Sequence, residues 1–253
     1  AGPKLLLLET LRRHGLPDVD VVFSQWDNPL VSRHDAPPAD HFWGSGDPRW
    51  RNRTTLGALP VLSPSTGSNW LDLTYPDYTF LYPRVNRYGT QSWDQAREAG
   101  LRAGEEAGEW SGRVDVAAFS GNCNQPSEHA PRRRLARLAE EHPGELWVNQ
   151  VVQGSPQSEA DCVEALDLRR AGGLTRDVCS LRTHDLCRFR YLVSVSPGGS
   201  YSGRLKYLLL CGSVVVHVRY AMDVYEFYQA RLEPGVHYVE VGDVGDVPAA
   251  VRR

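Results

Sequence analysis

The stretch at residues 196–218, "SPGGSYSGRLKYLLLCGSVVVHV", decides the fold and raises the question of whether its Gly/Ser-rich part binds an anion. "SPGGSYSG" is rich in Gly and Ser and favours a loop, "RLKYLLLC" has helical character, and "SVVVHV" is apolar and β-branched, as in a buried strand. The segment before it, "RFRYLVSV" (188–195), is also strand-like. The succession of strand, loop, helix and strand predicts a βαβ unit in a mainly parallel sheet.

The loop in this unit has the composition of an anion-binding site. A loop that leads from a strand into a helix offers backbone N–H groups and a positive dipole end, which suit phosphate. Arg204 can hold a diphosphate through two parallel hydrogen bonds, and Lys206 can add a second positive charge. The alternative is an ordinary turn followed by a solvated Arg and Lys on an amphipathic helix. Spacing alone leaves both interpretations open.

A second strand, loop and helix lie earlier in the chain. "RVDVAAFS" (113–120) is strand-like, and "PRRRLARLAEEH" (131–142) predicts a helix with Pro in its first turn. Ligands of open α/β sheets bind beyond the carboxyl ends of the strands, so Arg132 is a candidate to face the same anion. Arg133 and Arg134 are expected on a solvated face.

The N-terminal part is less regular. "DVDVVFS" (18–24) predicts a strand, and Asp27 follows it, where a catalytic carboxylate would be useful. The alternative for Asp27 is the opening of an Asp-Asn-Pro turn. We expect a domain boundary near residue 110. It would separate a first unit, 1–110, from a second unit, 111–253.

Composition excludes some classes of function. The 253 residues carry a net charge of −3, which argues against nucleic acid or an anionic membrane as the main partner. No apolar run approaches the roughly 18 residues that span a bilayer. The five cysteines match no zinc spacing such as C-x₂-C. Because the first residue is not Met, we expect a chain truncated at one or both ends.

Several motifs follow one another in a specific order. They are a D-x-C stretch before a strand, a Gly/Ser loop ending in S-x-R-x-K, and then L-C-G-S, E-F-Y and P-x-V-H-Y. In residues, these are Asp185 and Cys187, Ser202-x-Arg204-x-Lys206, Leu210-Cys211-Gly212-Ser213, Glu226-Phe227-Tyr228 and Pro234-x-Val236-His237-Tyr238. This order resembles glycosyltransferase family 90, the protein O-glucosyltransferases and capsule-associated xylosyltransferases. Weaker matches at "FSGN", "SWD" and "YPDYTF" extend the resemblance over nearly the whole chain.

The resemblance implies an α/β fold of the GT-B type, with two Rossmann-like lobes and the donor nucleotide held mostly by the C-terminal lobe. It implies transfer of glucose or xylose from a UDP-sugar to a hydroxyl of a protein or glycan acceptor, with inversion. Neither a metal nor a cofactor is implied beyond the UDP-sugar co-substrate. The implied location is the lumen of the secretory pathway, in the endoplasmic reticulum or Golgi.

The resemblance also implies roles for residues. Asp27 matches the catalytic base, and Cys187 and Cys211 match a disulfide of the family. The implied donor-binding residues are Asn122, Arg132, Gly199, Ser200, Tyr201, Ser202, Gly203, Arg204 and Glu226.

The chain departs from the family at one donor-contacting motif. The family's F-R-G-S is Phe119-Ser120-Gly121-Asn122 here, so its Arg and its second Ser are replaced. This departure leaves an alternative function open, that of a catalytically silent homologue that binds a nucleotide sugar or glycan or serves as a scaffold. The retention of Asp27, Arg132 and Arg204 favours the transferase.

Overall fold

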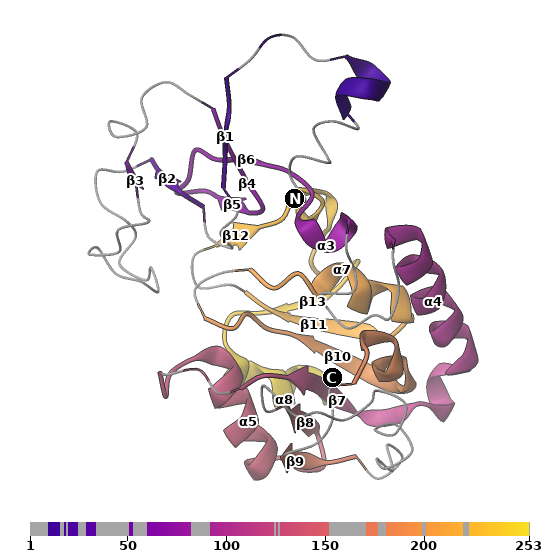
Figure 1. Cartoon of the computed structure of the whole chain (residues 1–253). Coiled ribbons are helices and arrows are strands. Elements are labelled where there is room, and N and C mark those ends of the chain that lie inside the picture. Colours follow the sequence, from indigo (N-terminus) through magenta and orange to yellow (C-terminus); the bar gives the residue numbers. More distant parts are fainter. Residues whose placement is uncertain are drawn as a thin grey trace.

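The computed structural model is an α/β structure built on two parallel sheets, one large and one small (Figure 1). It describes residues 10–15, 18, 20–24, 29–33, 51–52, 60–81, 92–123, 125, 127–151, 171–176, 181–198, 201–219 and 223–252. Within these residues, no helix has the length and apolar character needed to cross a membrane.

The large sheet has six strands, all parallel. They are β7 (Val114–Gly121), β8 (Leu146–Gln150), β9 (Gly173–Arg176), β10 (Phe189–Ser194), β11 (Val214–Val218) and β13 (Val239–Val241). Their order in the sheet is β13-β11-β10-β7-β8-β9. If the six strands are numbered 1 to 6 along the chain, the order from the β9 edge is 3-2-1-4-5-6. This is the strand order of Rossmann-type sheets. The predicted parallel sheet is therefore confirmed.

Helices cover both faces of the large sheet (Figure 1). On one face α5 (Pro131–Glu141) and α8 (Val247–Val251) pack on a core that includes Phe119 and Val216. On the other face Leu192 and Val215 belong to a second core, which four helices cover. These are α4 (Trp93–Glu106), η4 (Thr183–Arg188), α7 (Leu205–Leu208) and η5 (Leu209–Cys211). Because both faces are buried, the strands are nearly continuously apolar.

Helix α4 approaches the short helix η5 closely through its glycines. A Cβ on Gly104 would lie 2.8 Å from the carbonyl oxygen of Cys211, so only glycine fits there without a shift. Cys211 is joined to Cys187 by a disulfide, which agrees with the pairing that the resemblance implies. Helix α4 thus packs on η4, η5 and α7, which cover the large sheet, although it lies before residue 110. The division into 1–110 and 111–253 stays a prediction.

The small sheet has the parallel order β1-β4-β6, formed by Val22–Phe23, Val61–Ser63 and Leu73–Thr74. Two further strand pairs lie beside it: β2 (Val31–Ser32) with β3 (Arg51–Asn52), and β5 (Thr66–Gly67) with β12 (Val224–Tyr225). Further short helices are α3 (Tyr78–Leu81), η2 (Trp110–Gly112), η6 (Gln229–Arg231) and η7 (Val244–Asp246), and residues 10–14 are also helical. Since β12 belongs to the C-terminal half, the β5–β12 pair joins the two halves of the chain.

The carboxyl ends of the two sheets meet. Asp77 follows β6 of the small sheet, and Tyr201 follows β10 of the large sheet. The Tyr201 hydroxyl donates to Asp77 Oδ2 over 2.9 Å. At the same edge of the small sheet, the Tyr75 hydroxyl donates to the carbonyl of Ser24, directly after β1. The chain directly after β1, the segment after β6 and the loop after β10 therefore come together at one junction.

Candidate functional site

The large sheet has its topological switch point between β7 and β10. These neighbouring strands are continued in opposite directions across the sheet, by β8 on one side and β11 on the other. In open α/β sheets, ligands bind at the carboxyl ends of the two strands that flank such a point. In this chain those ends lead to Asn122 after β7 and to residues 195–198 after β10.

Arg132 reaches this edge from the first turn of α5. Pro131 opens the helix, and its fixed φ suits the first helical position. Arg132 Nε donates to the carbonyl of Val195 over 3.2 Å, and Nη2 donates to Ser202 Oγ over 3.3 Å. One guanidinium therefore connects the helix after β7 to the loop after β10.

Arg204 reaches the same edge from the start of α7. Its Nη1 donates to the carbonyl of Ser120, the penultimate residue of strand β7. A Cβ on Gly121 would lie 3.0 Å from Arg204 Nη2, so the glycine leaves room for the guanidinium. The guanidinium carbons of Arg204 and Arg132 lie 5.2 and 5.4 Å from the ring centroid of Phe119. Two positive charges therefore gather around one aromatic ring.

The free thiol of Cys123 lies next to these arginines. Its side chain is 1% exposed, and burial raises its pKa to about 11, although Arg132 and Arg204 both act to lower it. The thiol is therefore neutral at physiological pH. The carbonyl of Asn122 accepts a hydrogen bond from Gln125 Nε2 over 3.0 Å, which orders the loop after β7.

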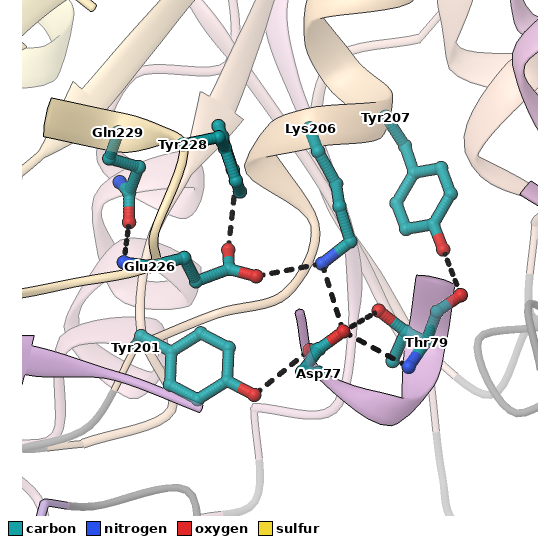
Figure 2. A network of polar contacts seen from close by, with 8 residues as sticks. All are labelled: Asp77, Thr79, Tyr201, Lys206, Tyr207, Glu226, Tyr228 and Gln229. Atoms are coloured by element: carbon teal, nitrogen blue, oxygen red, sulfur yellow. Dashed lines mark hydrogen bonds and ion pairs between the residues drawn. The ribbon is translucent and has the colours of Figure 1, made fainter. Parts of the chain in front are cut away.

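Lys206 lies in a separate cluster of buried charges (Figure 2). Its Nζ is 2.8 Å from Glu226 Oε1 and 3.5 Å from Asp77 Oδ1, and its side chain is 3% exposed. The interpretation of Lys206 as a solvated side chain is wrong, and its contribution of charge to a diphosphate site stays a prediction. A buried ammonium requires counter-charges, and the two carboxylates supply them.

Both carboxylates of this cluster are held by further hydrogen bonds (Figure 2). Asp77 Oδ1 accepts from the backbone N–H and the hydroxyl of Thr79 over 3.0 and 2.6 Å. Glu226 Oε2 accepts from the Tyr228 hydroxyl over 2.8 Å. Burial raises the pKa of Glu226 to about 7, Lys206 opposes the increase, and the charge of Asp77 adds to it.

The predicted donor-binding residues fall into three groups. Arg132, Ser202 and Arg204 come together at the switch point. Tyr201 and Glu226 belong to the Lys206 cluster, and Gly203 lies against it. Asn122 lies in the loop after β7. Asp27, Gly199 and Ser200 lie outside the described residues. The contacts of all these residues with a donor stay predictions.

Sequence reasoning did not identify Asp77, which accepts from Tyr201 and pairs with Lys206, or Thr79, which donates two hydrogen bonds to Asp77. The stretch "YPDYTF" was noted only as a weak match, and its Asp was not singled out. A carboxylate placed between a Pro and aromatic residues was the available signal. In the part of the chain that the structure describes, no group of three or more His, Cys, Asp or Glu side chains could hold a metal ion.

Comparisons with known proteins give a consistent result. The model of glycosyl transferase family 90 matches residues 4–252. Protein O-glucosyltransferase 1 of Rattus norvegicus is 29% identical over 257 residues, which cover 98% of this chain and 54% of that protein. O-glucosyltransferase rumi of Drosophila pseudoobscura pseudoobscura is 30% identical over 232 residues, 88% of this chain and 47% of that protein. The chain spans about half the length of the curated relatives it matches.

Proposed function

The chain belongs to glycosyltransferase family 90, and on this premise we propose that it is an inverting O-glycosyltransferase. The donor is a UDP-sugar, and the acceptor is a hydroxyl of a protein or glycan. Glucose is the first sugar to test because the relatives are named O-glucosyltransferases, and xylose is the second.

The observation that carries this proposal is the pair of guanidiniums around Phe119 at the switch point. A UDP-sugar presents a diphosphate, and planar guanidiniums bind phosphate oxygens through paired hydrogen bonds. Ser202 already accepts from Arg132, so the loop after β10 and the helix after β7 form one candidate clamp. Two positive charges can offset the charge of the departing UDP, and for this reason we propose a transfer that uses neither a metal nor another cofactor.

In the proposed reaction the acceptor oxygen attacks the anomeric carbon of the sugar. The bond from that carbon to the phosphate oxygen breaks, and UDP leaves with the electron pair. Asp27 takes the proton of the acceptor hydroxyl as general base. Arg132 and Arg204 stabilise the negative charge that develops on the diphosphate. A single displacement of this kind inverts the configuration of the anomeric carbon.

The proposal includes the architecture and the compartment. Two parallel sheets whose carboxyl ends meet at Asp77 and Tyr201 support a two-lobed GT-B arrangement, with residues 1–110 on the acceptor side and 111–253 on the donor side. The Cys187–Cys211 disulfide supports the lumen of the secretory pathway, because disulfides persist in oxidising compartments.

A second candidate function is a silent homologue that binds a nucleotide sugar or glycan without transfer, or serves as a scaffold. The observation that favours it is Ser120, which stands where the family has an arginine. The hydroxyl of Ser120 accepts a hydrogen bond from Asn149 and its carbonyl accepts one from Arg204, so this position brings no positive charge to the donor edge.

The test of the donor site is the thermal unfolding midpoint with UDP, UDP-glucose, UDP-xylose and ADP, with and without EDTA. A ligand at about 100 times its dissociation constant adds about 2.7 kcal/mol to stability. We expect an increase specific to the uridine nucleotides and insensitive to EDTA. Arg204→Ala should abolish it. Arg133→Ala is the matched control and should keep it, because Arg133 pairs with Glu128. No increase with any nucleotide in the wild type would contradict the proposal.

Asp27→Asn separates the two candidate functions. For a transferase, this variant should lose turnover of the UDP-sugar and keep the UDP-induced increase in the unfolding midpoint. For a silent homologue, the wild type itself shows no turnover, and the variant does not differ from it.

A further inference from the structure

The segment 201–206 has two sides. Ser202 and Arg204 face the switch point, where they contact Arg132 and the end of β7. Tyr201 and Lys206 face the opposite way and contact Asp77. The same short segment therefore carries candidate donor contacts on one side and a buried anchor on the other.

We propose that Asp77 is a positioning residue for the donor-binding segment. It holds Tyr201, and through Tyr201 it sets Ser202 and Arg204 in the geometry that receives the donor diphosphate. This inference rests on the proposed function, because it names what orders the same site. Asp77 does not itself touch the donor in this proposal.

Asp77 has the properties of a fixed anchor (Figure 2). Its side chain is 1% exposed. Both its oxygens are engaged, Oδ1 by Thr79 and Lys206, and Oδ2 by the Tyr201 hydroxyl over 2.9 Å. Hydrogen bonds to an ionised acceptor are the strong ones, and burial protects them from competition with water. The carboxylate therefore holds Tyr201 from an element 124 residues away in the sequence.

The anchor lies close enough to order the segment. A Cβ on Gly203 would lie 3.2 Å from Asp77 Oδ2 and 3.3 Å from Lys206 Nζ, so the backbone between Ser202 and Arg204 passes directly over the buried pair. The Tyr201 ring also packs with Trp70 and Val224. A binding loop that is ordered before its ligand arrives avoids part of the entropy cost of binding.

The anchor also connects the two sheets. Two residues before Asp77, the Tyr75 hydroxyl donates to the carbonyl of Ser24 at the end of β1. In the sequence, Asp27 follows three residues after Ser24. One segment, 75–77, thus contacts both the strand that precedes the proposed base and the loop that carries the proposed diphosphate contact.

The test compares two tyrosines that each lose one hydroxyl. Tyr201→Phe removes the hydrogen bond to Asp77, and Tyr207→Phe removes a bond of similar length, 2.8 Å, to the carbonyl of Thr79. Both rings are buried and stay packed, so both variants should fold and lose similar stability. We expect Tyr201→Phe to weaken UDP affinity about tenfold and Tyr207→Phe to change it less than about twofold, as measured by calorimetric titration of the whole protein.

A double-mutant cycle distinguishes positioning from direct contact of Tyr201 with the donor. Asp77→Asn should also weaken UDP binding. The double variant Tyr201→Phe/Asp77→Asn should lose no more UDP affinity than the single variant with the larger loss, because both substitutions break the same hydrogen bond. Additive losses, or an Asp77→Asn variant that binds UDP as the wild type does, would overturn the inference and leave the proposed function intact. A wild type that binds no UDP would overturn the proposed function, and the inference with it.

Discussion

Arg204 and Lys206 are two residues apart and carry the same charge, yet they belong to different regions of the molecule. Arg204 lies at the switch point with Arg132, where the two guanidiniums bind carbonyl and hydroxyl oxygens and contact the ring of Phe119. Lys206 lies in a buried cluster between the carboxylates of Asp77 and Glu226. A positive charge is available to an anionic ligand only where internal carboxylates have not already neutralised it.

The chemistry of the two cations fits these regions. A guanidinium is planar and weakly hydrated, so it can lie against an aromatic ring and keep a forked set of donors for phosphate. An ammonium is compact and strongly hydrated, so its burial costs several kcal/mol unless counter-charges surround it. We therefore expect substitutions at Lys206 to act on stability first and substitutions at Arg204 to act on ligand binding first.

The largest expected effect is that of Lys206→Met on stability. This change leaves two buried carboxylates without their cation, and breaking a buried ion pair in this way costs about 3–5 kcal/mol. The measurement is the free energy of unfolding in urea. The control is Lys206→Met/Glu226→Gln, which should recover part of the loss because one of the unpaired charges is removed. A loss below about 1 kcal/mol, the value for an exposed pair, would show that Lys206 is not buried in solution.

The next effect in size is that of Arg204→Lys on UDP affinity. The substitution keeps the charge and removes the planar fork, so we expect affinity to fall about tenfold while the free energy of unfolding changes little. Calorimetric titration with UDP measures it, with Arg133→Lys as the control, because Arg133 pairs with Glu128 and is not among the proposed donor contacts. Equal affinities for Arg204→Lys and the wild type would mean that charge alone, and not guanidinium geometry, serves this site.

The last expected effect is a difference in the pH dependence of stability. Glu226 has a pKa of about 7 in the folded protein and about 4.5 when unfolded, so its folded form binds the proton more tightly. Its contribution to stability is fully present below pH 4.5 and is lost as pH rises through 7. The glutamine of Glu226→Gln does not titrate, so this variant does not lose stability in that way as the pH rises. The variant should therefore gain stability relative to the wild type between pH 5 and pH 8, as followed by urea unfolding at each pH. A constant difference would contradict the raised pKa.

The sequence predicted three of the six strands of the large sheet and the helix α5 that covers it. The apolar runs at 113–120, 188–195 and 213–218 became β7, β10 and β11, and "PRRRLARLAEEH" became α5. These elements are readable because both faces of the sheet are covered and because Pro131 marks a helix start. Strand β9, with only four residues including a Gly and a Thr, carries too short a pattern to be read.

The candidate site was predictable in part. Glycines and arginines near strand ends indicated the donor edge, and the structure brings Arg132 and Arg204 to one ring there. The partners of Tyr201, Lys206 and Glu226 were not predictable. Asp77 is 124 residues from Tyr201, and no local pattern reports a contact over such a separation.

The sequence by itself determined the parallel α/β architecture, the two strand-loop-helix units that carry arginines, and the family. Those features are local, since the spacing of apolar residues and the chemistry of Gly, Pro and Arg act within a few residues. Only the tertiary structure placed Arg204 at the switch point and Lys206 between two buried carboxylates. That placement depends on what lies opposite each side chain. Glu226 is 20 residues from Lys206 in the sequence, whereas Asp77 comes from the segment after β6 and reaches Lys206 only when the two sheets pack together.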